Sequence, residues 1–229
     1  MPDLLDEPEL VAPLYTQREA AALIGVPPTT FRGWARGYAY RAVDGTTRVA
    51  DPLVTTTGPG RGAVVPFVGL GEAYVLAAFR EAGVPMQRIR PAVSWLEEHI
   101  GLRAALTSER LRTDGAELLW DFAHASDGPG EPVDDLVVIR NQQIVFRDVI
   151  AQYLSTITYR DGRLVAIRLP SFRPEVVLDP WRNFGQPTLA RSGVRVQDVR
   201  DRLAAGETVV EVATDYGVPL ADVEDLAAA

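Results

Sequence analysis

Residues 16–36 read Thr-Gln-Arg-Glu-Ala-Ala-Ala-Leu-Ile-Gly-Val-Pro-Pro-Thr-Thr-Phe-Arg-Gly-Trp-Ala-Arg, and this stretch predicts two short helices joined by a tight corner. Thr16 and Glu19 have the spacing of a capping box, in which each side chain satisfies a backbone amide at the start of a helix. Glycine ends a helix because it tolerates positive φ, and proline is favoured where the next helix begins. Gly25-Val26-Pro27 therefore marks a helix–turn–helix corner, a common scaffold for reading DNA.

The tripeptide Gly-Val-Pro occurs three times, at residues 25–27, 83–85 and 217–219. In each copy the fourth residue after the proline is apolar, so we expect the second helix of each pair to pack through it: Phe31, Ile89 and Val223. The helix after the first copy carries arginines and no acid, whereas residues 220–226 carry three acids and no base. Because DNA phosphates repel an acidic surface, the architecture repeats but we do not expect the third copy to contact DNA.

The composition of the 229-residue chain is that of a folded protein with one large core or two to three small ones, at 47% hydrophobic and 24% charged residues. The absence of cysteine excludes disulfides and thiolate metal sites. The two histidines, His99 and His124, are far apart in sequence. We therefore expect no metal and no other cofactor. The lack of a long apolar stretch and of a basic N-terminal flank predicts a cytoplasmic protein without a membrane partner.

Charge is distributed unevenly along the chain, whose net charge is −8. Residues 14–64 hold six arginines and three acids, whereas residues 207–229 hold six acids and no base. The overall acidity argues against a protein that coats nucleic acid without specificity. The pattern predicts that one end of the protein meets DNA and the other does not.

Residues 38–67 change to short strand-like runs, and a β-hairpin directly after a helix–turn–helix is a wing that lays basic residues along DNA. We expect the glycine-rich stretch 58–62 to form the tip of this wing. Residues 70–100 have helical periodicity, residues 102–115 predict a connection with one helix, and residues 118–122 predict the beginning of a strand-rich section.

The second half of the chain begins after a predicted linker at residues 127–132, which is rich in glycine and proline. The remaining expected elements are strands at 136–140 and 144–146, a short helix at 148–154, a hairpin of 156–159 with 164–167, and three helices from Val196 onward. The fold class is therefore α+β. We expect a winged helix–turn–helix domain with an additional helical pair over 1–126, a β-rich section over 127–173, and a β-hairpin with three helices over 174–229.

Two parts of the sequence resemble known families. Residues 15–26, followed by Phe31-Arg32-x-Trp34, resemble the winged helix–turn–helix of MerR-like regulators. The C-terminal part resembles a small antitoxin-associated domain through these motifs: Asp179-Pro180, Phe184-Gly185-Gln186-Pro187, Gly193-Val194-Arg195, and Ala205-Gly206-Glu207-Thr208. Val194 stands where that domain more often has threonine.

Together the two parts resemble the antitoxin of a VapBC-type toxin–antitoxin pair. The resemblance implies a cognate PIN-like ribonuclease toxin as partner and repression of the protein's own operon through operator DNA. It also implies a homodimer or a larger complex with the toxin. The C-terminal domain would then bind the toxin, drive dimerisation, or do both.

The candidate DNA-binding residues lie on the second helix of the first corner and on the wing. We expect three to lie nearest the bases, namely Thr29, Thr30 and Arg32, and four to pair with phosphates, namely Arg36, Arg41, Arg48 and Arg61. For Arg32 and Arg36 the alternative is an ordinary solvated helix face.

A PIN-like nuclease holds Mg²⁺ through clustered acids, and an inserted arginine can block such a site. Five arginines are candidates, each of which is alternatively an ordinary surface charge: Arg160, Arg163, Arg168, Arg191 and Arg195. The acidic helix 220–228 is a different candidate, because it can pair with basic RNA-binding residues of the toxin.

Three other functions compete with this interpretation. An enzyme needs positioned acids, bases or nucleophiles, and Glu97-Glu98-His99 is the only cluster of histidine with acids, so we expect no catalysis. The second is a MerR-like regulator without a toxin, whose C-terminal half senses a small molecule through aromatic residues: Tyr153, Tyr159, Phe172, Trp181 and Phe184. The third is that of a scaffold protein, which would have no affinity for DNA.

Overall fold

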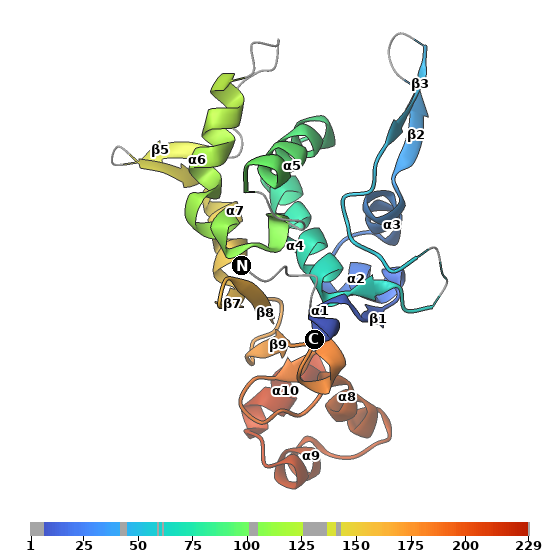
Figure 1. Cartoon of the computed structure of the whole chain (residues 1–229). Helices are drawn as coiled ribbons and strands as arrows, with labels where there is room; N and C mark the ends of the chain where they lie inside the picture. The colour runs from blue at the N-terminus through green and yellow to red at the C-terminus, as the bar shows by residue number, and fades with distance from the viewer. Residues whose placement is uncertain are drawn as a thin grey trace. The chain divides into compact units, whose positions relative to one another are not determined.

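The computed structural model describes residues 7–41, 45–58, 60, 62–100, 105–125, 137–140 and 143–228. The chain forms two compact units. We call residues 1–155 with 160–164 the N-terminal unit, and residues 156–159 with 165–229 the C-terminal unit (Figure 1). The predicted α+β class is confirmed.

The first corner is formed by α2 (Gln17–Leu23) and α3 (Pro28–Arg36). The capping box is present: the Glu19 amide donates to Thr16 Oγ1 at 3.2 Å, and the Thr16 amide donates to Glu19 Oε2 at 2.7 Å. Gly25 has a φ of 71°, which permits the corner. Phe31 and Trp34 are buried and hold α3 in place, so the predicted corner is confirmed.

The wing is the antiparallel pair β2 (Tyr38–Arg41) and β3 (Thr47–Ala50), in which Tyr38 lies opposite Ala50. The expectation that residues 58–62 form its tip is wrong, because the hairpin turns between Arg41 and Thr47. The glycine-rich stretch instead precedes β4 (Val65–Pro66), which pairs with β1 (Pro13–Tyr15). Gly45, at a φ of 80°, supplies the turn residue that the short hairpin needs.

The core of the N-terminal unit is α4 (Phe67–Glu81), which is buried from Phe67 to Phe79. It is followed by α5 (Met86–Ile100) after a corner at Gly83, whose φ is 89°. The other elements of this unit are α1 (Pro8–Val11), η2 (Ala105–Thr107), α6 (Glu109–Ala125), β5 (Val137–Arg140), β6 (Gln143–Phe146) and α7 (Asp148–Ser155).

The expectation that strands begin at 118–122 is wrong, because these residues lie within α6. Trp95 of α5 packs against Phe122 of α6 with ring centroids 5.7 Å apart. The run therefore belongs to a helix that packs on α5, and Leu119 within it is buried. The predicted linker and the expected domain boundary at 126 and 127 lie outside the described residues, and the boundary at 173 and 174 stays a prediction.

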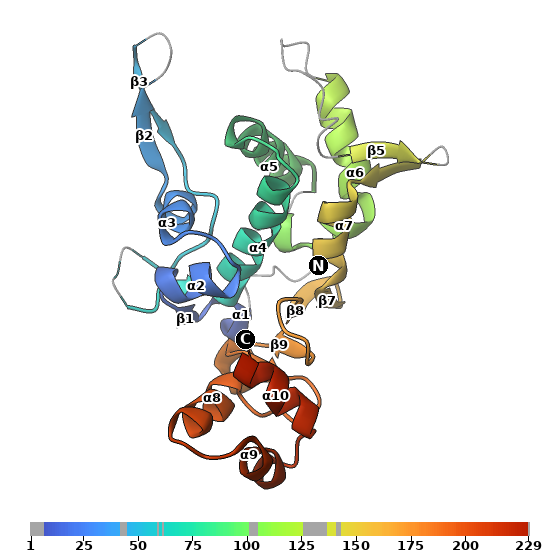
Figure 2. The ribbon, with the colours of Figure 1, turned by 180° about the vertical axis from the view of Figure 1, so that it is seen from behind.

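The C-terminal unit contains most of a four-stranded sheet in the order β10-β9-β8-β7, with β10 (Thr188–Leu189), β9 (Val176–Leu178), β8 (Arg163–Leu169) and β7 (Ile157–Arg160). A short 3₁₀ turn, η4 (Asn183–Gly185), lies between β9 and β10. Three helices follow and gather together, as Figure 2 shows: α8 (Val196–Ala204), α9 (Val209–Tyr216) and α10 (Leu220–Ala228). The expected hairpin with three helices is confirmed.

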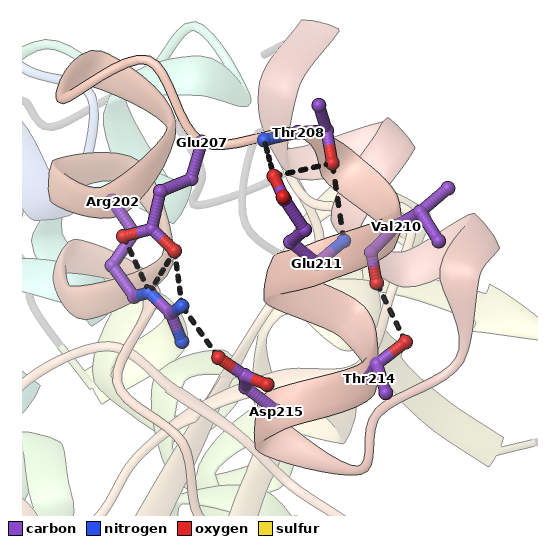
Figure 3. Close-up of polar contacts among 7 residues, drawn as sticks. All are labelled: Arg202, Glu207, Thr208, Val210, Glu211, Thr214 and Asp215. Carbon is purple, nitrogen blue, oxygen red and sulfur yellow. Dashed lines mark hydrogen bonds and ion pairs between the residues drawn. The ribbon is translucent and has the colours of Figure 1, made fainter.

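Two of the three helices, α8 and α9, are tied together by a polar network around Arg202 (Figure 3). Its guanidinium donates to both carboxylate oxygens of Glu207 and, at 2.7 Å, to Asp215 Oδ2. A second capping box opens α9, in which the Glu211 amide donates to Thr208 Oγ1 at 3.3 Å. The network links the end of α8 to both ends of α9.

Candidate nucleic-acid interface

One face of α3 presents a polar, basic stripe. Thr29, Arg32 and Arg36 are exposed, and their spacing of three and four residues places them along one side of the helix. Phe31 and Trp34 on the opposite side are buried. The apolar side of α3 therefore fixes the direction in which its arginines project.

This stripe borders an open groove of about 840 Å³ that gathers residues from four elements of the N-terminal unit. The predicted residues among its lining are Thr29, Thr30, Arg32 and Arg36. Sequence reasoning missed three others: Tyr38 at the start of the wing, Arg80 near the end of α4, and Gln87 in the first turn of α5. Three arginines with hydroxyl and amide side chains form a surface suited to phosphate oxygens and base edges.

Arg80 and Gln87 flank the second Gly-Val-Pro corner, which the sequence did show. Arg80 Nη1 donates to the carbonyl of Val84 within that corner at 2.8 Å. The repeated Gly-Val-Pro tripeptide was thus visible in the sequence, but no local sequence pattern indicated that the second corner lies beside the first.

The wing presents different side chains on its two faces. Arg48 lies opposite Tyr40 and Arg41 lies opposite Thr47, so the two arginines project from opposite faces of the hairpin. Arg48 shares its face with Tyr38 and Tyr40, whose rings are 6.0 Å apart. The structure therefore brings Arg48 together with the two tyrosines and separates it from Arg41. Arg61 lies outside the described residues.

The base of the wing is fixed to the helices behind it. The guanidinium of Arg90 on α5 lies 5.5 Å from the ring centroid of Tyr38, and Arg90 donates to the carbonyl of Asp51. The Leu53 amide donates to the carbonyl of Trp34 at 2.8 Å. Contacts from α3 and α5 thereby hold the wing in a defined position relative to the α3 stripe.

Glu72 of α4 secures the segment that follows the wing. Its carboxylate accepts hydrogen bonds from the Thr55 amide at 2.6 Å and from Thr55 Oγ1 at 3.0 Å. Burial raises the pKa of Glu72 to about 7, and the charge of Glu97 adds to this, although the hydrogen bonds from Thr55 oppose it. A buried carboxyl thus joins α4 to the wing's exit.

The five candidate toxin-binding arginines do not form one cluster within a single unit. Arg160 and Arg163 belong to the N-terminal unit, whereas Arg168, Arg191 and Arg195 belong to the C-terminal unit. Arg163 is half-buried and paired with Glu7. Arg195 is exposed but holds Asp198 with two hydrogen bonds, at 2.8 and 2.6 Å. Both of these pairs have to open before the guanidinium can enter a partner's site.

The other three arginines are also exposed. Arg160 ends β7 beside the hairpin turn, and Arg168 lies on β8. Arg191 lines a pocket of about 250 Å³ together with Arg173 and Asp222. The role of these residues in toxin binding stays a prediction.

The two histidines both lie in helices of the N-terminal unit. His99 stacks on Trp95 at 3.5 Å and its Nδ1 lies 2.9 Å from the Trp95 carbonyl oxygen. His124 lies in α6. Tyr153 packs on Tyr74 of the N-terminal unit, whereas Trp181 and Phe184 are exposed in the C-terminal unit. Among the described helices, none is both long and apolar enough to cross a membrane.

Comparisons with known proteins agree with this geometry. Residues 13–93 match the family model described as "Putative DNA-binding HTH domain", and residues 176–228 match the family described as "Protein of unknown function (DUF433)". The first match contains the groove and the wing. It carries nine arginines and five acids, whereas the second carries five arginines and nine acids. The basic and acidic ends of the chain therefore coincide with two separate families.

Whole-chain relatives come from Mycobacterium tuberculosis. The protein "Uncharacterized protein Rv2308" is 30% identical over 93% of this chain and 87% of its own length. The X-ray crystal structure of Rv2018 superposes with a TM-score of 0.81 at 44% identity, covering 94% of this chain and 98% of that chain. "Putative antitoxin VapB45" is 48% identical over 90% of this chain and 89% of its own length. The chain belongs to the family of this VapB45 protein, with a helix–turn–helix domain of the DNA-binding type near its N-terminus and a DUF433 domain at its C-terminus.

Proposed function

We propose that this protein is the antitoxin of a VapBC-type pair, which binds and neutralises a cognate PIN-like ribonuclease and represses its own operon. In this proposal it is a cytoplasmic binding protein without catalytic activity, and it works as a dimer or in a larger complex with the toxin. The similarity to VapB45 supports a toxin partner, and the helix–turn–helix corner with its wing supports operator DNA.

The proposal that this protein binds DNA rests mainly on the groove beside α3. Arg32, Arg36 and Arg80 line it together with Thr29 and Thr30. In the proposed complex α3 enters the major groove with its first turns nearest the bases, and the wing face that holds Tyr38, Tyr40 and Arg48 follows the phosphate backbone. Arg41, on the other face, then contributes less than Arg48.

Fluorescence anisotropy with the DNA upstream of the protein's own gene tests this part. Each phosphate contact contributes about one unit to the slope of log affinity against log salt concentration. We therefore expect Arg36→Ala and Arg48→Ala to weaken binding to all sequences and to lower that slope by about one unit each. Arg32→Ala should instead relax sequence preference, at a cost of about 1 to 3 kcal/mol for a lost base contact.

Arg110→Ala is the matched control, because Arg110 is an exposed arginine on α6, outside the groove and wing. It should leave both affinity and slope unchanged. Equal effects of Arg110→Ala and Arg36→Ala would show that only overall charge matters, and the assignment of the groove would then be withdrawn.

Inhibition of the PIN-like nuclease encoded beside this gene tests the toxin-binding part. The purified nuclease should lose its Mg²⁺-dependent RNA cleavage when the chain is added in equal amount. If the chain bound DNA but did not inhibit the nuclease, the alternative of a MerR-like regulator would replace the antitoxin proposal. The C-terminal unit would then be screened for small ligands.

A further inference from the structure

The turn at residues 179–187, between β9 and β10, is organised by its first residue. Asp179 Oδ1 accepts a hydrogen bond from the Trp181 amide at 2.9 Å. The Asp179 carbonyl accepts from the amides of Arg182 and Gly185, both at 3.0 Å. The chain between these residues is thereby closed into a compact loop.

The backbone of this turn is unusual. Asn183, Phe184 and Gly185 have consecutive φ values of 50°, 53° and 72°. Glycine adopts this region freely and asparagine tolerates it, but a bulky residue such as phenylalanine seldom does. Phe184 therefore occupies a strained conformation that the surrounding contacts must maintain.

Side-chain hydrogen bonds from within the same unit lock the turn in this shape. Asn183 Nδ2 donates to Thr188 Oγ1 at 3.0 Å and to the Gly193 carbonyl at 2.9 Å. The buried Thr188 hydroxyl donates to the Gln186 carbonyl at 2.7 Å. Arg182 Nη1 donates to the Ala190 carbonyl at 2.8 Å. The strained shape is thus fixed by several independent contacts.

The strain does not serve to bury Phe184 in the fold. Phe184 is 78% exposed and Trp181 is 46% exposed, whereas Leu178 and Leu189 on the flanking strands are buried. Strain that persists because its surroundings enforce it is concentrated at functional sites. Exposed aromatic side chains held rigidly are typical of the few residues that dominate a protein–protein interface.

We propose that the turn 179–187 is the preorganised anchor by which this protein holds its nuclease partner, with Phe184 and Trp181 entering an apolar pocket bordered by carboxylates. This inference rests on the proposed function. In this inference the aromatic residues of the turn contact the toxin, in addition to any contact made by the five candidate arginines.

The charge around the turn indicates which partner it fits. Residues 173–195 hold four arginines and two acids, whereas residues 196–228 hold two arginines and eight acids. A basic segment complements a nuclease whose metal site is built from clustered carboxylates. A second copy that met this protein through the same turn would bring two basic segments together, which is unfavourable.

The test uses the full chain and the purified PIN-like nuclease encoded beside its gene, with binding followed by titration calorimetry. We expect Phe184→Ala and Trp181→Ala each to weaken binding about 30-fold, as hot-spot residues do. Val210→Ala is the matched control, because Val210 on α9 is 61% exposed in the same unit and has ordinary helical backbone. It should bind like the unaltered chain.

Phe184→Gly separates a binding role from a structural one. Glycine relieves the strain at positive φ, so this variant should unfold at a temperature no lower than Phe184→Ala and yet bind as weakly. Binding of Phe184→Ala and Trp181→Ala at full strength would overturn the inference while leaving the proposed function intact. The inference would also be overturned if these variants lost self-association, measured by sedimentation, and kept their binding to the nuclease. Failure of the unaltered chain to bind the nuclease would overturn both the inference and the toxin-binding part of the proposed function.

Discussion

Thr55 donates two hydrogen bonds to the carboxylate of Glu72, one from its amide at 2.6 Å and one from its hydroxyl at 3.0 Å. Thr55 follows the wing in sequence, and Glu72 lies in the middle of the buried helix α4. A Cβ at Gly69, one turn earlier on α4, would lie 2.2 Å from the Thr55 carbonyl oxygen. The exit of the wing therefore packs directly on the backbone of α4, and Glu72 anchors it there.

Glu72 should make the stability of the N-terminal unit depend on pH. Because burial raises its pKa from the ordinary 4.5 to about 7, the folded state binds a proton that the unfolded state has released between these values. The favourable contribution is complete below pH 4.5 and is lost as the pH rises through 7. Up to about 3 kcal/mol of unfolding free energy should disappear over this window. Urea denaturation between pH 4.5 and 8 measures it.

Glu72→Gln should remove this pH dependence, because the amide cannot ionise, while one amide oxygen still accepts from Thr55. Glu117→Gln, at an exposed position on α6, is the control and should keep the full dependence. If Glu72→Gln retained the decline between pH 4.5 and 7, another group would have to cause it.

Alanine substitutions at two glycines near the start of the wing should have opposite effects on the stability of the protein. Gly37 has a φ of 67°, and a Cβ there would lie 2.1 Å from the Ala50 carbonyl oxygen across the base of the wing. Gly37→Ala should therefore cost about 1 to 3 kcal/mol and weaken DNA binding through displacement of the wing. Gly33 lies inside α3, where a Cβ would make an ordinary 3.7 Å contact with the Tyr38 ring.

Gly33→Ala should thus stabilise the protein by up to about 1 kcal/mol, since alanine is the better helix former. Thermal melts of both variants and anisotropy with operator DNA provide the comparison. Destabilisation by both substitutions to the same extent would argue against the close approach at Gly37.

The sequence predicted the corners well because their determinants are local. Gly25, Gly83 and Gly217 all adopt positive φ. Phe31, Ile89 and Val223 are all fully buried. Capping and glycine conformation depend on residues a few positions apart, so they can be recognised without knowledge of the tertiary fold.

The predictions that failed depended on distant contacts. An apolar run such as 118–122 fits a buried strand or a helix equally well, and packing against α5 decides for the helix. Gly115 of the same helix leaves room for Phe146 of β6, because a Cβ there would lie 3.0 Å from the Phe146 ring. The groove likewise combines α3 with Arg80 and Gln87, more than 40 residues away in sequence, and no local pattern indicated that.

The two capping boxes allow the two ends of the chain to be perturbed separately. Thr16→Ala and Thr208→Ala each remove a hydroxyl that accepts from a backbone amide at the start of a helix, and each should cost about 1 kcal/mol. Only Thr16→Ala should also weaken operator binding, because α2 supports α3. Anisotropy on both variants checks this, and equal losses of DNA affinity would contradict it.

Arg202→Met should make the C-terminal unit less stable at neutral pH and also less sensitive to acid. The hydrogen bond from Arg202 holds the pKa of Glu207 below its ordinary 4.5. A carboxyl with a lowered pKa stabilises the fold above its unfolded-state value, and that stability is lost as the pH falls through the folded-state value. The sign is opposite to that of Glu72. Methionine keeps the apolar length beside Tyr216, over whose ring the guanidinium lies at 5.2 Å, but it provides no partner for Glu207 or Asp215.

The difference in melting temperature between the unaltered chain and Arg202→Met should therefore be largest at pH 7 and should shrink progressively from pH 5 to pH 3. Arg173→Met is the control, because the Arg173 side chain is 87% exposed and reaches Asp225 only at 3.6 Å, and such surface pairs contribute little. A difference that stayed constant down to pH 3 would mean that Arg202 acts through packing on Tyr216. The ion pairs with Glu207 and Asp215 would then have no measurable part in holding α8 and α9 together.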